Sequence, residues 1–355
     1  MQTDSIPHID TKNANKQIAH WLMVGVAMIV VQVLIGGITR LTESGLSITE
    51  WKPITGILPP MGDAVWQELF EKYKQTDQFK YVHQHFSMSE FKMIFFWEWF
   101  HRVWARLMGM VFLIGFIYFL AKRKFKREMI LPMVILFVLG GIQGFIGWIM
   151  VKSGLVPEKF YVGHIELTTH FIAALILLSY TWWFALKLKT PTHAIQVNRP
   201  LNKGLILLLV VLFFQLIYGG FMAGLKAAIS APTWPTINGS WMPAEMFSED
   251  GLLKNISFNP LMIHFIHRGL GYLLFIVVFI WWVKAKHIQT YKPVGFFRTA
   301  LLVLIVLQVG LGILTVMNAT NNTLLIWVGV SHQFVAMLLV LTLVALLFFI
   351  RSKKE

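Results

Sequence analysis

The sequence predicts an all-α integral membrane protein in which eight transmembrane helices form two pseudo-symmetric four-helix bundles. Hydrophobic residues make up 56% of its 355 residues and charged residues only 14%, which lies outside the usual composition of soluble domains. Eight apolar stretches are each close to the roughly 20 residues that a helix needs to cross a bilayer. The two halves of the chain also repeat the same short motifs in the same order.

The eight predicted spans are joined by short connections, apart from one long loop at residues 39–92. The first four spans and this loop form an N-terminal half, 1–190, and the last four spans form a C-terminal half, 191–355. The predicted spans are 17–38, 93–120, 129–150, 162–186, 203–222, 261–283, 299–317 and 323–350.

Basic residues indicate how the spans are oriented. If the N-terminus is cytoplasmic, the cytoplasmic segments hold 18 Lys and Arg residues and the outer segments hold 10, six of them in the long loop. Because short cytoplasmic loops are enriched in Lys and Arg, we expect a multi-pass protein of the cell inner membrane with both termini in the cytoplasm. The net charge of +14 follows from this bias and from attraction to anionic lipid. We therefore expect membrane lipid, and no nucleic acid, as a partner.

The chain contains no cysteine. Disulfides, thiolate metal sites and covalent c-type haem attachment are therefore excluded. Any redox activity must rest on a cofactor or metal that other residues hold.

Four motifs recur in the two halves and define an internal repeat. Because each repeat contains four spans, the second begins on the same side of the membrane as the first, so the repeat is parallel, with a pseudo-two-fold axis along the membrane normal. The matching pairs are QVLIGG (32–37) with QLIYGG (215–220), FHR (100–102) with IHR (266–268), QGFIGW (143–148) with QVGLGI (308–313), and THFIAALILL (169–178) with SHQFVAMLLVL (331–341).

Four of the twelve histidines occupy matched positions on the second and fourth span of each half. At about 1.5 Å per residue they lie roughly 9–14 Å below the outer surface. Ionisable side chains inside a bilayer are costly unless they are paired, ligated or in contact with water, so we predict that these histidines are ligands. They are His101, His170, His267 and His332.

The spacing of these histidines favours haem over a bare metal ion. Copper and zinc sites usually recruit several close ligands, including carboxylate or thiolate, whereas here each half offers one histidine from each of two helices. Two imidazoles facing each other across a bundle match the axial positions of a haem iron. We therefore predict two haem sites, one in each half.

The two halves differ in their carboxylates. Glu98 lies three residues before His101, on the same helix face, whereas the matching residue before His267 is His264. A carboxylate beside a haem can act as a general base or stabilise a developing cation; the alternative is a structural ion pair between Glu98 and Arg102, one turn further on. We interpret the difference as a reactive first half and an electron-handling second half.

Other polar residues near the histidines have roles that the sequence leaves open. Arg102 and Arg268 either bind haem propionates or lie towards the core. Arg40, at the start of the polar segment 39–60, is a third candidate for a propionate contact. That segment is either a solvated cap on the bundle or a lid over the outer edge of the haem. The roles of His164, Glu166 and His264 are undefined.

Three longer stretches make the chain resemble the haem A synthase family, of the cysteine-free type found in Gram-negative bacteria and mitochondria. The resemblance spans nearly the whole chain, with HRGLGY and SHQ supplying the later helices. The stretches are GGITRLTESGLSITEWKPITGILPP (36–60), EFKMIFFWEWFHRVWARLMG (90–109) and TWPTING (233–239).

This resemblance implies an inner-membrane enzyme that oxidises the C8 methyl group of haem O to a formyl group by successive hydroxylation, giving haem A for cytochrome c oxidase. It implies that His101 and His170 flank the substrate haem and that His267 and His332 ligate a haem b cofactor near the periplasmic side. Glu98 is then the catalytic carboxylate. The implied partners are a haem O synthase and an electron acceptor, either a quinone or another redox protein, and homo-oligomerisation stays open.

Two alternatives lack this chemistry: a haem-binding electron-transfer subunit and a haem shuttle. Parallel repeats and basic inner loops suit a transporter too, although transporters tend to have broken helices at the midplane. Glu98 separates the enzyme from the electron carrier, because only the enzyme needs its carboxylate for chemistry.

Overall fold

The computed structural model describes residues 11–50, 55–288 and 292–353, and within them it confirms an all-α membrane protein. Eight helices are long and apolar enough to cross a membrane, and each coincides within a few residues with the core of a predicted span. These helices are α1 (Thr11–Leu41), α4 (Met88–Ala121), α5 (Arg127–Gly154), α6 (His164–Lys189), α7 (Arg199–Gly224), α10 (Pro260–Lys284), α11 (Lys292–Met317) and α12 (Asn322–Phe349).

Several of the long helices begin at side chains that bind the free N–H groups of the first turn. Asn198, Asn259 and Asn321 each accept backbone N–H groups at the starts of α7, α10 and α12. Ser87 forms a capping box with Glu90 at the start of α4, where the Ser87 N–H donates to the Glu90 carboxylate at 2.7 Å. Such caps satisfy donors that would otherwise lack partners.

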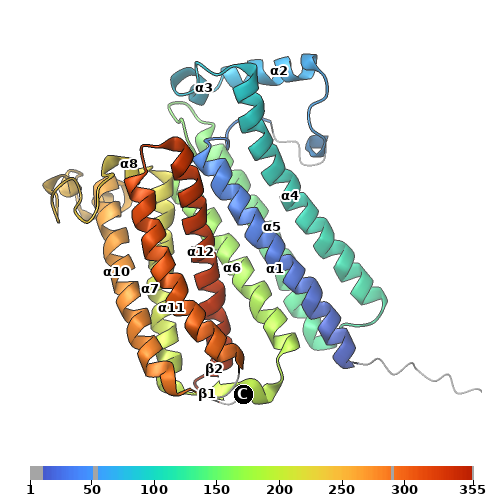
Figure 1. The fold of residues 1–355 in the computed structure, drawn as a ribbon. Helices are drawn as coiled ribbons and strands as arrows, with labels where there is room; N and C mark the ends of the chain where they lie inside the picture. The colour runs from blue at the N-terminus through green and yellow to red at the C-terminus, as the bar shows by residue number, and fades with distance from the viewer. Residues whose placement is uncertain (1–10, 51–54, 289–291, 354–355) are drawn as a thin grey trace, which may run out of the picture.

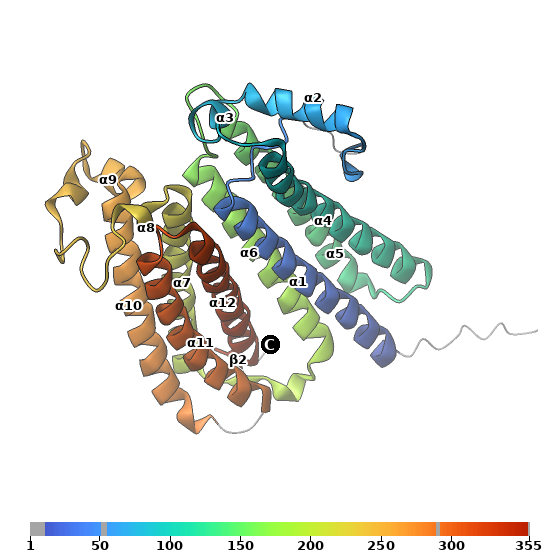
Figure 2. The same ribbon diagram turned by 45° about the horizontal axis from the view of Figure 1, so that its top comes forward.

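Shorter elements connect the long helices, and most of them lie at one end of the bundle, which we call the loop end (Figures 1 and 2). The loop end carries η1 (Thr55–Ile57), α2 (Asp63–Lys74), α3 (Asp77–Tyr81), α8 (Ala227–Ser230), η3 (Ala244–Phe247) and α9 (Leu252–Phe258). The opposite end carries η2 (Thr192–Ala194), β1 (Gln196–Val197), η4 (Ala285–His287) and β2 (Ile350–Arg351).

The two short strands were not predicted, because two residues carry no strand pattern. β1 and β2 pair in parallel, with Gln196 opposite Ile350. The side chain of Asn202 also donates to the carbonyl of Ile350 at 2.7 Å. The end of the chain is thereby tied to the connection between the two halves.

The packing of the long helices is consistent with two related halves. In the first half α1 packs against α4 and α6, and α5 packs against α6; in the second half α7 packs against α10 and α12, and α11 against α12. Between the halves, α1 packs against α12, α6 against α7, and α6 against α12. One hydrophobic core runs through both halves, in which α12 is the most buried spanning helix and α4 the least.

One pair of helices departs from this correspondence. In the second half α10 packs against α11, whereas the backbones of the equivalent α4 and α5, over the residues that the structure describes, approach each other less closely. They meet through aromatic side chains, where Phe112 and Phe116 of α4 contact Phe137 of α5. On the loop-end side of this contact, a Cβ added at Gly140, Gly141 or Gly144 of α5 would meet no atom within 4 Å.

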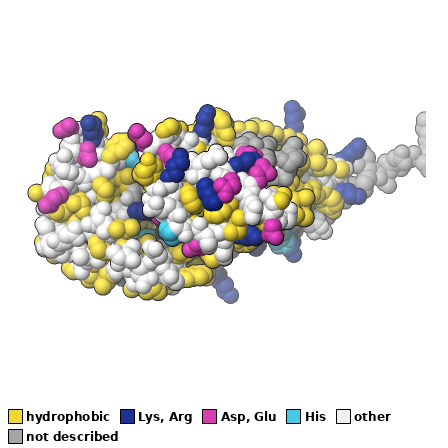
Figure 3. All heavy atoms as spheres, turned by 90° about the horizontal axis from the view of Figure 1, so that it is seen from above, with side chains coloured by type: hydrophobic (Ala, Val, Ile, Leu, Met, Phe, Trp, Pro, Cys, Tyr) yellow, Lys and Arg dark blue, Asp and Glu magenta, His cyan; other side chains and the backbone are white. Residues whose placement is uncertain are grey.

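The long loop of the first half packs onto α4 through a separate small core. Phe70 and Tyr73 of α2 stack on Phe91 of α4 with ring centroids 5.0 and 5.2 Å apart. Seen from above, charged side chains of both signs are interspersed with hydrophobic ones on this face (Figure 3).

Candidate functional site

Each of the four matched histidines lies against a glycine of the preceding spanning helix. A Cβ at Gly36 would lie 3.2 Å from His101 Nε2, and one at Gly147 would lie 2.8 Å from His170 Cε1. The corresponding distances to Cε1 are 3.3 Å for Gly219 and His267 and 3.1 Å for Gly312 and His332. A larger residue would press on the imidazole ring in every case.

These glycines place the histidines at a common depth. Gly36, Gly219 and Gly312 are each five residues from the loop end of their helices, and Gly147 is seven residues from it. At about 1.5 Å per residue this corresponds to about 8–10 Å. The helices that carry the histidines start at different heights, so counting from their starts, as the sequence analysis did, gives a less uniform depth.

A glutamine one turn before each glycine contacts the same histidine. The Nε2 atoms of Gln215 and Gln308 lie 3.4 and 3.2 Å from the Nε2 atoms of His267 and His332. Gln143 Nε2 lies 3.3 Å from His170 Nδ1, and Gln32 donates to the backbone carbonyl of His101 at 3.2 Å. The motif pair QGFIGW and QVGLGI shares Gln-x-x-x-Gly on the third spanning helix of each half. The same pattern precedes all four histidines and could have predicted these contacts.

The second-half pair fits the axial positions of a haem iron. The rings of His267 and His332 are 6.4 Å apart between centroids, at an interplanar angle of 71°. Imidazole nitrogens about 2 Å from one metal, on opposite sides, place ring centroids about 6 Å apart. The Nδ1 atoms of both rings, and the side-chain oxygens of Gln215 and Gln308, are buried without a hydrogen-bond partner, so each glutamine is placed to orient its imidazole.

The first-half pair is less closely associated. His101 and His170 lie near enough to interact electrostatically, but no ring contact joins them in the described part of the chain. No group of three or more His, Cys, Asp or Glu side chains among the described residues could hold a metal ion.

Glu98 is buried and fully engaged by donors. Its Oε2 atom accepts from the Ser47 hydroxyl at 2.7 Å and from the Ile48 N–H at 2.8 Å, and its Oε1 atom accepts from Arg102 at 2.6 Å. The side chain of Glu98 is only 3% exposed. The ion pair that the sequence analysis offered as an alternative is thus present, and Glu98 also fastens the long loop to α4.

The second half contains an equivalent arrangement with different chemistry. Arg268 donates to His264 Nε2 at 3.0 Å, just as Arg102 donates to Glu98. Arg102 also donates to the carbonyl of Ile48 at 3.3 Å, and Arg268 donates to loop carbonyls between residues 233 and 236. Each arginine therefore holds the loop that follows the first helix of its own half. Contacts of either with a haem propionate stay a prediction.

Arg40 bridges the two halves at the loop end. It donates to the carbonyls of Ala223 and Gly224 at the end of α7, at 2.7 and 3.1 Å, and its guanidinium lies 5.6 Å from the Tyr161 ring centroid. A cation at a helix C-terminus is favourable. Its predicted propionate contact is not tested by these bonds.

His164 and Glu166 lie in the first turn of α6, before His170. His164 is buried against Gly224, and its Nε2 atom lies 2.8 Å from the carbonyl of Ser257. The carboxylate of Glu166 lies over Gly163, at the start of its own helix. The structure thus gives His164 a place at the contact between the halves.

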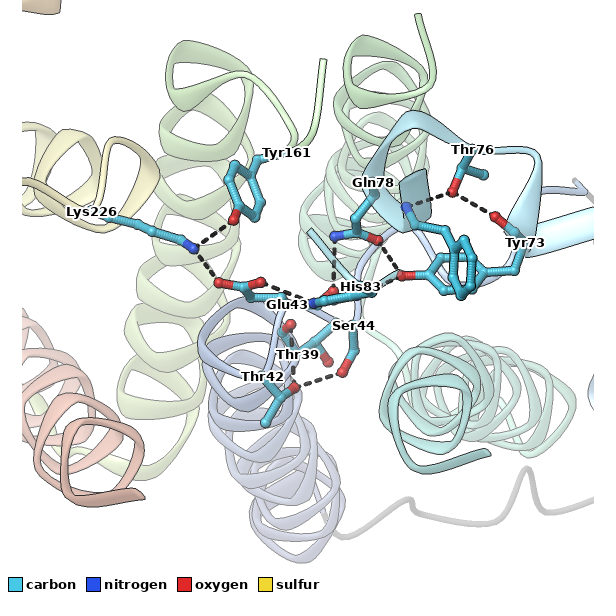
Figure 4. A network of polar contacts seen from close by, with 11 residues as sticks. Thr39, Thr42, Glu43, Ser44, Tyr73, Thr76, Gln78, His83, Tyr161 and Lys226 are labelled. Atoms are coloured by element: carbon cyan, nitrogen blue, oxygen red, sulfur yellow. Dashed lines mark hydrogen bonds and ion pairs between the residues drawn. The ribbon is translucent and has the colours of Figure 1, made fainter. Parts of the chain in front are cut away.

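A polar network at the loop end was missed by the sequence analysis (Figure 4). The Glu43 carboxylate bonds to Lys226, and it accepts from His83 Nε2 at 3.1 Å because an ionised carboxylate can only accept. The Tyr73 hydroxyl lies 2.7 Å from His83 Nδ1, and Lys226 donates to the Tyr161 hydroxyl at 2.9 Å. These residues come from four separate segments of the chain, so no local sequence pattern predicts that they form a network.

Burial and charge shift the pKa values of two members of this network. Burial alone would raise the pKa of Glu43, but hydrogen bonds from His83 and Lys226, together with their charges, outweigh it and lower the pKa to about 2. Burial raises the pKa of Tyr73, and the charges of Glu98 and Glu43 raise it further. Glu43 is therefore ionised and Tyr73 neutral at physiological pH.

The fold and these side chains define the class of protein as a multi-pass helical membrane protein with two pairs of half-buried histidines near one end of its bundle. The chain belongs to the family of cytochrome oxidase assembly proteins, whose family model matches residues 19–344.

Three relatives are named haem A synthase. The protein of Nitrosospira multiformis is 39% identical over 345 residues, covering 96% of this chain and 95% of the relative. That of Flavobacterium psychrophilum is 38% identical, covering 92% and 96%, and that of Paracoccus denitrificans is 38% identical, covering 92% and 86%. The family to which the sequence analysis found a resemblance is thereby confirmed.

Proposed function

We propose that this protein is a haem A synthase, an oxidoreductase that converts the C8 methyl group of haem O to a formyl group by successive hydroxylation. Relatives of this name match nearly the whole chain. The observation that carries the proposal is an asymmetry between two similar sites: both have a histidine pair with its glutamines and glycines, but only the first has a carboxylate, Glu98, beside its histidine. Haem A made in this way would serve cytochrome c oxidase.

In this proposal the second half holds haem b. His267 and His332 would be its axial ligands, with Gln215 and Gln308 fixing their orientation. A bound haem b would supply one-electron redox chemistry at this position. The chain itself contributes two imidazoles whose ring centroids are 6.4 Å apart, a separation that suits two ligands of one iron.

The first half would bind haem O as substrate between His101 and His170. Glu98 would stabilise the positive charge that develops at the methyl carbon when it loses electrons. The alternative role, deprotonation of the attacking water, is less well supported, because both carboxylate oxygens already accept from Ser47, Ile48 or Arg102. Electrons would leave to an acceptor, a quinone or another redox protein.

The location follows from the charge bias and the bacterial relatives. We propose that the protein lies in the cell inner membrane, with both termini in the cytoplasm and the loop end facing the periplasm. Both histidine pairs would then lie near the periplasmic surface. A haem O synthase would supply the substrate, and the question of a homo-oligomer is open.

The test is co-expression with a haem O synthase in cells that make no haem A, followed by extraction and chromatography of the haems. Wild-type protein should yield haem A, and Glu98→Ala should yield at most a small fraction of that amount while haem b stays bound. If wild-type protein yields no haem A, the proposal is wrong.

A haem-binding electron carrier is the second candidate, and one observation favours it. Glu98 has the full set of donors expected of a structural anchor, which needs no role in chemistry. The variant Glu98→Gln separates the two functions, because the amide can still accept from Ser47 and Ile48 but carries no charge. The enzyme should lose haem A formation in this variant, whereas a carrier should keep its haem and its redox behaviour unchanged.

A further inference from the structure

The segment 43–48 is held at both ends by residues of different parts of the molecule. At one end Ser47 and Ile48 donate to Glu98 on α4. At the other end the carboxylate of Glu43 bonds to Lys226, which follows α7 in the second half. Most of the intervening segment is buried, with Ser44 fully enclosed and Leu46 nearly so.

The segment is also held by hydrogen bonds within it and to the end of α1. The Ser44 N–H donates to the carbonyl of Thr39 at 2.9 Å, and the Ser47 N–H donates to the carbonyl of Ser44 at 3.1 Å. The hydroxyl groups of Ser44 and Thr42 lie 2.6 Å apart. Glu43 and the two donors that hold Glu98 thus belong to one short, buried and hydrogen-bonded segment.

The backbone at the ion pair is fixed in an unusual conformation on both sides. Glu43 has φ of 58° and Lys226 has φ of 53°, and both lie in the left-handed region that residues with a side chain rarely adopt. Such conformations persist where the surrounding structure determines them, and they cluster at functional positions. Here they point the two side chains towards each other (Figure 4).

The two residues also occupy equivalent positions in the internal repeat. Glu43 and Lys226 are 183 residues apart, the same offset as between Arg40 and Ala223, which also bond to each other. It is likewise the offset between the matched residues Gln32 and Gln215. The ion pair therefore joins the halves at the point where each meets its own counterpart.

We propose that Lys226 is a positioning residue of the second half for Glu98 of the first, acting through Glu43 and the segment 43–48. Tyr161 and His83 complete the surroundings: Tyr161 accepts from Lys226 and His83 donates to Glu43. Gln78 also donates to the Glu43 carbonyl at 3.1 Å. Lys226 is the member of this set that reaches Glu43 from the other half. The proposal rests on the proposed function for its catalytic consequence, but the contact it describes can be measured without activity.

The experiment uses full-length protein with bound haem b and compares Lys226→Met with Lys226→Arg. Hydrogen exchange at the Ile48 amide, which donates to Glu98, reports whether the segment still sits on Glu98, and exchange at the Ser47 amide, which donates to Ser44, reports whether the turn within the segment is intact. Lys226→Met should accelerate their exchange about tenfold, the size expected from losing one charged hydrogen bond, and should lower kcat for haem A formation with little change in KM. Lys226→Arg should restore both, because it keeps the charge.

Two controls make the outcome decisive. Lys254→Met removes an exposed lysine from α9 of the same half and should change neither quantity. If Lys226→Met does not fold, Glu43→Gln removes the ion pair from the side of the first half while keeping acceptors for His83 and Lys226, and it should accelerate the same exchange.

The outcomes distinguish this inference from the proposed function. Unchanged exchange at Ser47 and Ile48 in Lys226→Met would overturn the inference, whether or not the wild type makes haem A. Faster exchange in Lys226→Met, restored in Lys226→Arg, supports the positioning contact even if wild-type protein makes no haem A, in which case only the proposed function fails.

Discussion

The second spanning helix of each half carries the same three positions with different chemistry. The first half has Glu98, His101 and Arg102, and the second has residues 264, 267 and 268, in which histidine replaces the glutamate. In both halves the arginine bonds to the residue one turn before it and holds the loop after the first helix. The comparison teaches that the framework for placing a histidine is common to both halves, and that the carboxylate is the addition that makes one half different.

The helices around the two histidine pairs also differ in how closely they pack, and the half with the carboxylate is the more loosely packed. The helices next to the second histidine pair, α10 and α11, pack together, whereas the described parts of α4 and α5 are packed less closely and have their aromatic contacts towards the opposite end of the bundle. A cofactor stays in place, while a substrate must enter and leave. The looser half is the one for which we propose substrate binding.

Among the variants that test the difference between the halves, we expect the largest effect from replacing the second-half histidines. His267→Ala and His332→Ala should each abolish the low-spin bis-imidazole absorption spectrum of purified protein, because each removes one of the two axial ligands that we propose for haem b. His101→Ala should leave that spectrum in place. A spectrum retained in both second-half variants would show that haem b is bound elsewhere.

The carboxylate is the next test, through the matched variants Glu98→Ala and His264→Ala. Glu98→Ala should lower haem A formation on the order of a hundredfold or more, as for other groups that stabilise developing charge. It should also cost about 3 kcal/mol of stability, because Arg102 is left with a buried charge. His264→Ala should leave most of the product, since Arg268 keeps its loop carbonyls. Equal product loss in both would show that the halves share the chemistry. Haem chromatography and thermal unfolding in detergent measure the two effects.

A smaller effect is expected at the glycines that face the histidines. Gly312→Ala would bring a Cβ within 3.1 Å of the His332 ring, whereas Gly310→Ala meets nothing within 4 Å. We expect Gly312→Ala to shift the absorption spectrum of bound haem b. Overpacking should also lower the free energy of unfolding by about 1 kcal/mol. Gly310→Ala should resemble wild type. Identical spectra for the two variants would mean that the glycine does not set the ring position.

The smallest effect is the pH dependence of the ion pair between the halves. The pKa of Glu43 is lowered to about 2 from an ordinary value of 4.5. A lowered carboxyl pKa stabilises the folded state above the ordinary value, and the stabilisation is lost as pH falls towards the folded value. The difference in melting temperature between wild type and Glu43→Gln should therefore be constant from pH 7 to about 5 and shrink below about 4.5. A difference that already shrinks between pH 7 and 6 would contradict the assigned pKa.

The part of the fold that could be predicted from sequence is the part that depends on the length of continuous apolar runs. All eight spans were found because each is a continuous apolar run, and the four histidines were found because they interrupt such runs. The strands β1 and β2 and the short loop helices carry too few residues for a periodic signal.

The candidate site was predictable only in its repeated parts. His101, His170, His267 and His332 stand out because each has a counterpart, and the glutamines would have stood out for the same reason. The contact of Glu43 with Lys226 could not be predicted from the repeat, because the two residues lie in loops and are of different types, so they do not appear as a matched pair. The roles of Arg102 and Arg268 in holding loops depend on tertiary structure, since their acceptors are backbone carbonyls, which leave no trace in the residue types.

The charges of Glu43 and Lys226 have a consequence for how the molecule assembles. A contact across a two-fold axis brings a residue against its own equivalent, so two copies of the first half would oppose two carboxylates, and two copies of the second would oppose two ammonium groups. Attraction arises only when a first half, with its carboxylate, meets a second half, with its ammonium group. Repulsion between like charges in the other two pairings is a recognised source of selectivity. The divergence of a single position thus favours a first half joined to a second over either half joined to its own kind in a neighbouring molecule.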